Sequence, residues 1–351
     1  MKWRENISGD TSSSQKDFPE RRNSMCEGDG YNRVTGEEII SNADGDVTGK
    51  VRRFYELYQF PSVRPPDQDG LILMRRMTKR LSGRDGGETV RRRVLDAGCG
   101  TGNTSVSLAK QHSNVDFLGV DISSPSLSIA KKAAQKAGLR NIRFQKWDLM
   151  KPGLDDEPFD FILCLGVLHH TQNMGQVLTN LKNVMKDDGE FYLWVYGRHG
   201  RYRHSLNRCL LDMLLSVKPD SADPVELARD FALSTGGGNV LSDLFGDSLS
   251  DSAKEKIIKE PAWIADQFLN PHETLIEMRE LLDLVFTTGF EIDRWLGVAE
   301  SVSRYISSPE LVERFELLPK REQLIALDLM LKPDRYFVTL RKGTNGRGDE
   351  G

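Results

Sequence analysis

The chain has 351 residues, of which 38% are hydrophobic. This length allows a sizeable buried core and predicts either one large domain with additions or two small domains. The formal net charge of -4 gives no overall reason to expect binding to nucleic acid, which needs a basic surface. No apolar run is long enough to span a membrane, and the N-terminus lacks the apolar core of a signal peptide, so we expect a cytoplasmic protein that does not enter a membrane.

The N-terminal part of the chain divides into a polar segment and two helices. Residues 1–49 are rich in Ser, Asp, Glu, Gly and Asn, and they contain few apolar side chains. Such a segment cannot bury enough surface to offset the entropy lost on ordering, so we predict that it is disordered. Apolar residues at helical spacing predict a first helix that begins near Lys50 and ends before Pro61, and a second helix over 71–81. Residues 50–90 therefore form a helical segment ahead of the core.

The most informative stretch is residues 91–105, which read RRRVLDAGCGTGNTS. A short apolar strand leads into Asp96, three glycines spaced two apart follow, and a helix-compatible run begins at Asn103. Glycines here permit positive φ and close approach of the backbone to a ligand, while free N–H groups at the start of the helix face the turn. We therefore predict a strand, a tight turn that holds a small molecule, and a helix. The G-x-G-x-G spacing differs from the G-x-G-x-x-G spacing of NAD-binding turns.

The sequence DAGCGTG, from Asp96 to Gly102, resembles the first motif of class I S-adenosylmethionine-dependent methyltransferases. The order of later signals extends this resemblance over residues 94–342. It implies a doubly wound, Rossmann-like α/β fold with a seven-stranded, mostly parallel sheet whose last strand is antiparallel, N-terminal helices, and helical insertions after strands 5 and 6. It also implies S-adenosylmethionine as the cofactor. The residues of this motif that the resemblance assigns to cofactor binding are Asp96, Gly98, Gly100, Thr101 and Gly102.

Two further acids follow predicted strands. Asp121 ends the second strand, where a carboxylate can accept hydrogen bonds from both ribose hydroxyls. The alternative is a helix N-cap, a role that Asp121 could share with Ser123. Asp148 ends the third strand, and by resemblance it meets the adenine amino group; an NAD enzyme has no strong need for this second acid. The resemblance adds apolar cofactor contacts from Ile122, Trp147, Leu149 and Leu165.

The ends of the fourth and fifth strands supply the candidate catalytic residues His169, His170 and Tyr196. Strand ends of a doubly wound sheet face the ligand crevice, so these side chains should lie beside the transferable methyl group. Imidazole is a common general base near neutral pH. The same V-L-H-H pair occurs in family members with unrelated acceptors, so a packing role for the two histidines stays open.

Segments outside the core are candidates for the acceptor pocket. By resemblance, the N-terminal helices close over the cofactor as a lid, with Tyr55 and Tyr58 reaching inward; the alternative is that they only cover one edge of the sheet. Residues 198–270 are predicted to be a mostly helical acceptor-side insertion. Arg198 begins the basic run 198–204, which suits an acceptor with a carboxylate or phosphate, although a solvated surface is the ordinary role of such a run.

The predicted organisation follows from these assignments. It comprises a disordered segment (1–49), a helical lid (50–90), the cofactor-binding core (91–197), the acceptor-side insertion (198–270), the rest of the core (271–342) with a helical insert at 300–332, and a flexible tail (343–351).

The resemblance implies methyl transfer to an O or N atom of a small-molecule acceptor, with an anionic acceptor and specialised metabolism as the suggested setting. The N-P-P-Y or D-P-P-Y signature of amino-directed nucleic-acid methylation is absent, and LGVLHH stands in its place. Two alternatives stay open: an RNA or protein methyltransferase that docks through the basic stretches 75–93 and 198–203, and a non-catalytic S-adenosylmethionine-binding protein. The four cysteines show no C-x-x-C spacing, so we expect no metal site. A homodimer is compatible with the sequence.

Overall fold

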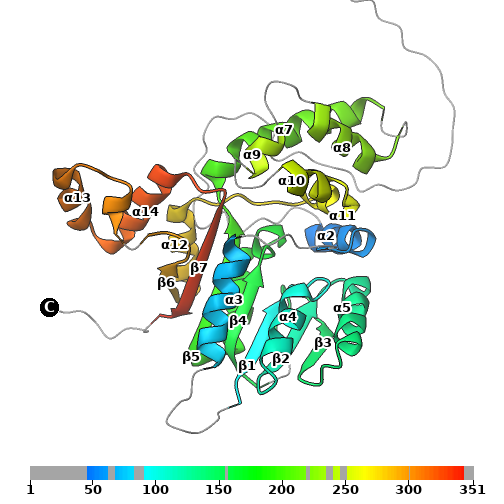
Figure 1. The fold of residues 1–351 in the computed structure, drawn as a ribbon, viewed down its shortest axis with the longest axis horizontal. Helices are drawn as coiled ribbons and strands as arrows, with labels where there is room; N and C mark the ends of the chain where they lie inside the picture. Colours follow the sequence, from blue (N-terminus) through cyan, green and yellow to red (C-terminus); the bar gives the residue numbers. More distant parts are fainter. Residues whose placement is uncertain are drawn as a thin grey trace, which may run out of the picture.

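The computed structural model describes residues 46–61, 68–82, 91–154, 157–218, 222–234, 240–245, 251–299 and 301–343. Predictions for 1–45 and 344–351 lie outside the described residues. The centre of the molecule is a seven-stranded sheet with the order β3-β2-β1-β4-β5-β7-β6 (Figure 1). The strands are β1 (Arg93–Ala97), β2 (Asp116–Asp121), β3 (Ile142–Lys146), β4 (Phe159–Leu165), β5 (Met185–Tyr196), β6 (Phe290–Trp295) and β7 (Arg335–Lys342).

The pairing of the strands confirms the predicted fold class. Strands β1 to β5 pair in parallel, and β7 is antiparallel to both β5 and β6. The chain runs outward from β1 to β3 and then returns to place β4 on the other side of β1. The order of a doubly wound sheet therefore reverses between β1 and β4, and ligands bind at the carboxyl ends of the strands at such a switch point.

Helices cover both faces of the sheet. One face is covered by α3 (Gln68–Leu81), α4 (Asn103–Gln111) and α5 (Ser124–Lys136), and the other by α6 (Met174–Asn183) and α12 (Met278–Thr287). Side chains alternate between the faces along each strand. Val94 and Phe161 pack with α3 and α4, whereas Leu95 and Ile162 pack with α6 and α12. The central strands are therefore buried on both faces, as in other parallel sheets.

A second hydrophobic cluster joins the N-terminal helix α2 (Val47–Leu57) to the segment that follows β5. That segment contains α7 (Arg198–Val217), α8 (Pro224–Ser234), α9 (Val240–Phe245), α10 (Asp251–Ile258), α11 (Pro261–Ile264) and a π-helix (Ala265–Leu269). Phe54 of α2 packs in this cluster with Trp263 and Phe268. Because α7 begins directly after β5 ends, these helices lie beyond the carboxyl ends of the strands, where Figure 1 shows them together. We call α2 and α7 to the π-helix the cap.

The segment between the last two strands in the sequence is also helical. After β6 the chain forms α13 (Pro309–Glu316) and α14 (Lys320–Leu331), and then returns to the sheet as β7. Figure 1 shows α13 and α14 on the side of the sheet away from β3. Across the described ranges, no helix has the length and apolar character needed to cross a membrane.

Candidate active site

A cavity of about 840 Å³ lies between the carboxyl ends of the strands and the cap. Its volume falls within the range of roughly 300–1,000 Å³ that is typical of small-molecule sites. The structure places most of the candidate residues on its wall: Asp96, Gly98, Gly100, Asp121, Ile122, Trp147, Asp148, Leu149, Leu165, His170, Tyr196 and Tyr55. It does not place Thr101, Gly102, His169, Tyr58 or Arg198 there.

The glycine turn after β1 requires glycine for two reasons. Gly98, Gly100 and Gly102 have φ of 79°, 53° and 79°, in the left-handed region that side chains disfavour. A Cβ on Gly98 would also lie 2.4 Å from a methyl group of Val167, and a Cβ on Gly100 would lie 2.2 Å from the carbonyl oxygen of Phe60. The turn is therefore enclosed by the segment after β4 on one side and by the segment after α2 on the other.

Thr101 and Gly102 have structural rather than cavity-lining positions. The Thr101 hydroxyl donates a hydrogen bond to the Pro61 carbonyl (2.6 Å), and the Thr101 N–H donates to the Phe60 carbonyl (3.3 Å). A Cβ on Gly102 would lie 2.8 Å from the Cβ of Ala130, so its smallness allows α4 to pack against α5. Thr101 thus bonds the turn to the segment after α2, and Gly102 allows close packing of α4 on α5. No sequence pattern indicated that Phe60 would lie over the turn.

Asp121 connects the end of β2 to the glycine turn. Its Oδ2 accepts a hydrogen bond from the Gly100 N–H and its Oδ1 from the Ser123 N–H, both at 2.8 Å. The N-cap role belongs to Ser123, whose Oγ accepts from the Ser126 N–H. Burial raises the pKa of Asp121, and the N–H groups oppose this shift. Since a carboxylate has about four acceptor positions, Asp121 keeps capacity for further hydrogen bonds on the cavity side.

The side chains after β3 form an apolar pocket with one acid. Trp147 and Leu149 are both buried, and Asp148 between them accepts a hydrogen bond from the Met150 N–H (3.0 Å). Ile122 and Leu165 line the same cavity. Flat apolar surface with a single carboxylate suits a heterocyclic base that has an amino group.

The two adjacent histidines have different surroundings. The His170 Nδ1 lies 2.8 Å from the carbonyl oxygen of His272; because a carbonyl only accepts, we assign the proton to Nδ1. In this tautomer the lone pair is on Nε2, and His170 lines the cavity. His169 is fully buried instead, with its ring centroid 4.0 Å from that of Tyr196. Burial lowers the pKa of His169 well below its usual value, so the buried ring is neutral, and its position against Tyr196 is that of a packing side chain.

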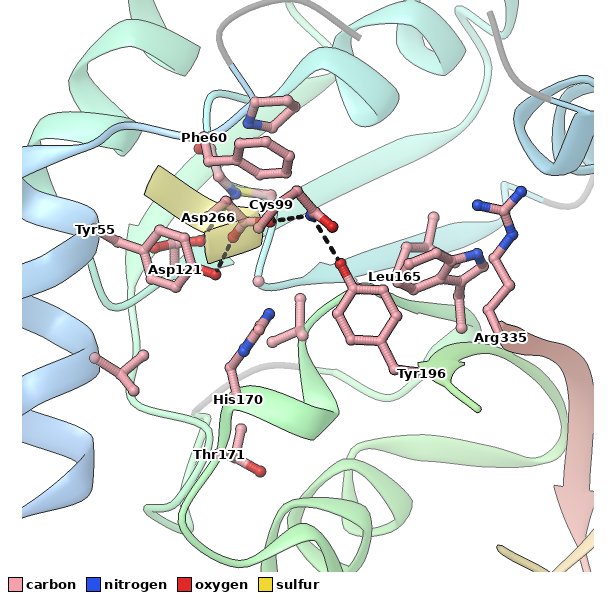
Figure 2. Close-up of a pocket in the computed structure, with 18 of the residues that line it drawn as sticks. Tyr55, Phe60, Cys99, Asp121, Leu165, His170, Thr171, Tyr196, Asp266 and Arg335 are labelled. Atoms are coloured by element: carbon pink, nitrogen blue, oxygen red, sulfur yellow. Dashed lines mark hydrogen bonds between the residues drawn. The ribbon is translucent and has the colours of Figure 1, made fainter. Parts of the chain in front are cut away.

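A hydrogen-bond network forms the wall opposite the glycine turn. Tyr55 donates to Asp266 Oδ1 (2.8 Å), and Gln267 donates to Asp266 Oδ2 (2.9 Å) and to the Tyr196 hydroxyl (3.0 Å). Figure 2 shows Tyr55, His170 and Tyr196, from three separate elements, gathered around Asp266. Burial raises the pKa of both tyrosines, so they stay protonated; Tyr55 donates to Asp266, and the Tyr196 hydroxyl accepts from Gln267. Asp266 and Gln267 belong to the π-helix, a geometry that is frequent at functional sites.

The predicted acceptor contacts Arg198 and Tyr58 lie away from this wall. Arg198, the first residue of α7, donates to both carboxylate oxygens of Glu280 in the first turn of α12 at 2.9 Å. Tyr58 packs with its ring centroid 5.2 Å from that of Phe54, inside the hydrophobic cluster of the cap. The prediction that these two residues bind the acceptor is therefore not supported by their positions.

Two other arginines line the cavity. Arg201 is buried with its guanidinium 3.5 Å from the ring centroid of Tyr196, and it pairs with Glu273 at 3.3 Å. Arg335 at the start of β7 pairs with Asp69 at 2.7 Å. Arg201 belongs to the basic run 198–204 noted in the sequence, but Arg198 was the residue chosen from that run. Arg335, Asp266 and Gln267 were not predicted, since no local motif marks them. Among the described residues, no cluster of three or more His, Cys, Asp or Glu side chains is arranged to hold a metal ion.

Comparisons with known proteins agree with this geometry. A family model described as a methyltransferase domain matches residues 89–202. A protein of Synechococcus is 27% identical over 68% of this chain and 57% of its own length. The ubiquinone biosynthesis O-methyltransferase of Pasteurella multocida is 32% identical over 30% of this chain and 47% of its own length.

Among solved structures, PKMT2 from Rickettsia typhi in complex with AdoHcy matches this chain with a TM-score of 0.58 and 16% sequence identity. The match covers 82% of this chain and 56% of the PKMT2 chain. At this identity the likeness shows the fold alone. The chain spans about half the length of these relatives. The matched domain, the sheet order and the glycine turn confirm the predicted resemblance. The chain therefore contains a methyltransferase domain of the class I S-adenosylmethionine-dependent family.

Proposed function

We propose that this chain transfers a methyl group from S-adenosylmethionine to an O or N atom of a small-molecule acceptor. The observation that supports the proposal is that one cavity extends from the glycine turn to the Asp266–Gln267–Tyr196 network. A cofactor at the turn and an acceptor at the network would therefore share an enclosed space. The O-methyltransferase and AdoHcy-bound relatives agree with this activity.

The cofactor half of the cavity has the groups that S-adenosylmethionine requires. Asp121 has hydrogen-bonding capacity left for a ribose, and Asp148 with its apolar neighbours suits an adenine. Gly98 and Gly100 leave the backbone of the turn bare of side chains. When bound, the cofactor supplies an electrophilic methyl group on a positively charged sulfur.

In this proposal, the acceptor half of the cavity orients the acceptor and removes its proton. Methyl transfer is an in-line displacement, so its rate depends on how well the protein orients the acceptor toward the methyl group. Tyr196 and Asp266 provide fixed polar groups for this purpose. We assign to His170, which lines the cavity, the role of taking a proton through Nε2 from the acceptor atom as the new bond forms. The cap lies over the strand ends and thereby limits the contact of the site with bulk water.

The test is to incubate the protein with methyl-labelled S-adenosylmethionine and fractions of small metabolites, and to find by mass spectrometry which molecule gains a methyl group. A Gly100→Val variant serves as the inactive control, because its side chain would collide with Phe60. We expect labelled product in a small-molecule fraction with the wild type only. Labelling confined to an RNA or protein fraction would support that alternative class, and AdoHcy binding without any transfer would indicate a non-catalytic protein.

A further inference from the structure

The acceptor half of the cavity contains a buried carboxylate that has no cationic partner in the described part of the chain. Asp266 is 3% exposed and lines the cavity. Its hydrogen bonds come from Tyr55 and Gln267, which are both neutral donors. No Lys, Arg or His among the described residues lies within ion-pair distance of it. Burying a carboxylate costs free energy unless a positive charge or several hydrogen-bond donors compensate it. A cationic ligand would supply the charge that Asp266 lacks.

The cations that line the cavity are already engaged or lie at its edge. Arg201 pairs with Glu273, and Arg335 pairs with Asp69. Each guanidinium also lies over an aromatic ring, that of Tyr196 or of Trp194. Lys332, the third cation of the lining, is exposed at the end of α14. Among the residues that the structure describes, the buried part of the acceptor half thus presents a negative group without a cationic partner and no unpaired positive one, which disfavours an anionic acceptor.

Aromatic rings surround the same carboxylate. Tyr55 bonds directly to Asp266, Trp263 precedes it on α11, and Tyr196 is connected to it through Gln267. All three aromatic side chains line the cavity. The faces and edges of such rings, combined with a carboxylate, form a favourable environment for a protonated amine attached to an apolar body.

We propose that the acceptor is an amine-bearing small molecule and that the Asp266 carboxylate binds its amino group. The inference rests on the proposed function, and it adds the chemical class of the acceptor. The amino group is the docking group, and the methyl group is accepted by an O or N atom of the same molecule. Asp266 is accordingly a specificity-determining residue that belongs to the π-helix of the cap.

Matched pairs of amines and acids test the proposal on the full chain. Calorimetry first measures AdoHcy binding, and then titrates tyramine against 4-hydroxyphenylacetate, and tryptamine against indole-3-acetate, into the AdoHcy-saturated protein. We expect each amine to bind at least about tenfold more tightly than its acid, as a charge-assisted contact predicts. Equal binding, preference for the acids, or binding of neither class would overturn the inference.

Variants of Asp266 test whether this side chain causes the preference for amines over acids. Asp266→Asn keeps the shape and a carbonyl acceptor for Tyr55 but removes the charge, so we expect the amine preference to disappear while AdoHcy affinity is unchanged. Asp266→Glu keeps the charge and should keep the preference. Asp243→Asn is the matched control, because Asp243 also lines the cavity but already bonds to Asn207 and Arg203.

An amine preference that survives Asp266→Asn contradicts the assignment. Failure of AdoHcy binding by the wild type would instead contradict the proposed function itself.

Discussion

The guanidinium of Arg201 lies 3.5 Å from the ring centroid of Tyr196, and Glu273 holds it there. Glu273 also pairs with Arg208 at 3.0 Å, so one buried carboxylate serves two arginines of α7. Burial alone would raise the pKa of Glu273, but the two guanidinium groups outweigh it and lower the pKa to about 2. This ionic cluster attaches α7 to the segment after the π-helix, and thereby positions the wall of the cavity.

Glu273→Gln should therefore destabilise the protein strongly. The change leaves two buried guanidinium groups without their carboxylate, and breaking a buried ion pair in this way typically costs about 3–5 kcal/mol. The free energy of unfolding in urea at pH 7 measures the loss. Glu310→Gln is the control, because Glu310 forms an exposed pair with Arg314 whose loss should have little effect. Equal losses in the two variants would contradict this account of the cluster.

The cofactor half of the site could be predicted because its residues are specified locally. Positive φ in a tight turn selects glycine, and a carboxylate that follows a strand is easily recognised, so Gly98, Gly100, Asp121 and Asp148 were found from the sequence. The exception is Gly102, whose smallness serves helix packing rather than the ligand. The doubly wound fold class followed from the family resemblance that these residues carry.

The acceptor half could not be predicted, because its residues depend on contacts between distant segments. In α7 the apolar residues Leu206, Leu210 and Met213 are exposed, whereas Arg201 and His204 are buried. Rules of amphipathic pattern place charged residues outside. They fail here because Glu273, far along the chain, compensates the buried charge. Asp266 was missed for a related reason: only the folded cap brings it against Tyr55 of α2.

Gly100→Ala should abolish AdoHcy binding. The new Cβ would lie 2.2 Å from the Phe60 carbonyl oxygen, so either the turn or the segment over it must move. Gly138→Ala is a matched control: Gly138 has a similar φ of 67°, but nothing lies within 4 Å of its Cβ position. The control carries only the conformational cost of a side chain at positive φ, about 1–2 kcal/mol, and should bind AdoHcy normally. Calorimetry distinguishes the two, and normal binding by Gly100→Ala would show that the turn tolerates a side chain.

Asp121→Asn should weaken AdoHcy binding by about 1.5–3 kcal/mol, because the hydrogen bonds it offers lose their charge. Part of the loss reflects the bond from the Gly100 N–H, which fixes the turn. Asp116→Asn at the start of the same strand is the control, since Asp116 pairs with Arg91 at the surface. If a folded Asp121→Asn variant bound AdoHcy with unchanged affinity, the role of this carboxylate would be to stabilise the turn and not to bind the cofactor.

The three histidines whose pKa is lowered most predict a loss of stability on mild acidification. Burial lowers the pKa of His169 and His204 well below the usual value, and lowers that of His272 to about 4. In the unfolded chain these rings titrate near about 6.5, so below this pH the unfolded state binds protons that the folded state does not. The free energy of unfolding should then fall by about 1.2 kcal/mol per histidine between pH 7 and 5.5, or about 4 kcal/mol in total.

Urea titrations at several pH values within this window measure the effect, while most carboxylates stay ionised. His272→Gln should reduce the pH dependence by about one third, since it removes one of the three groups. Equal stability at pH 7 and pH 5.5 would show that these rings take up protons in the folded state.

The two adjacent histidines should respond differently to substitution. His170→Ala removes the Nε2 that lines the cavity, so we expect turnover to fall by about 10²- to 10⁴-fold, with AdoHcy affinity little changed. The His169 ring is neutral, and neither of its nitrogens has a hydrogen-bond partner among the described residues. His169→Phe keeps an aromatic ring against Tyr196 and should retain most of the turnover. Added imidazole should restore part of the activity of His170→Ala, because it can take the proton in place of the missing ring. Wild-type turnover in His170→Ala, or a loss that imidazole does not relieve, would return His170 to a packing role and place proton removal elsewhere.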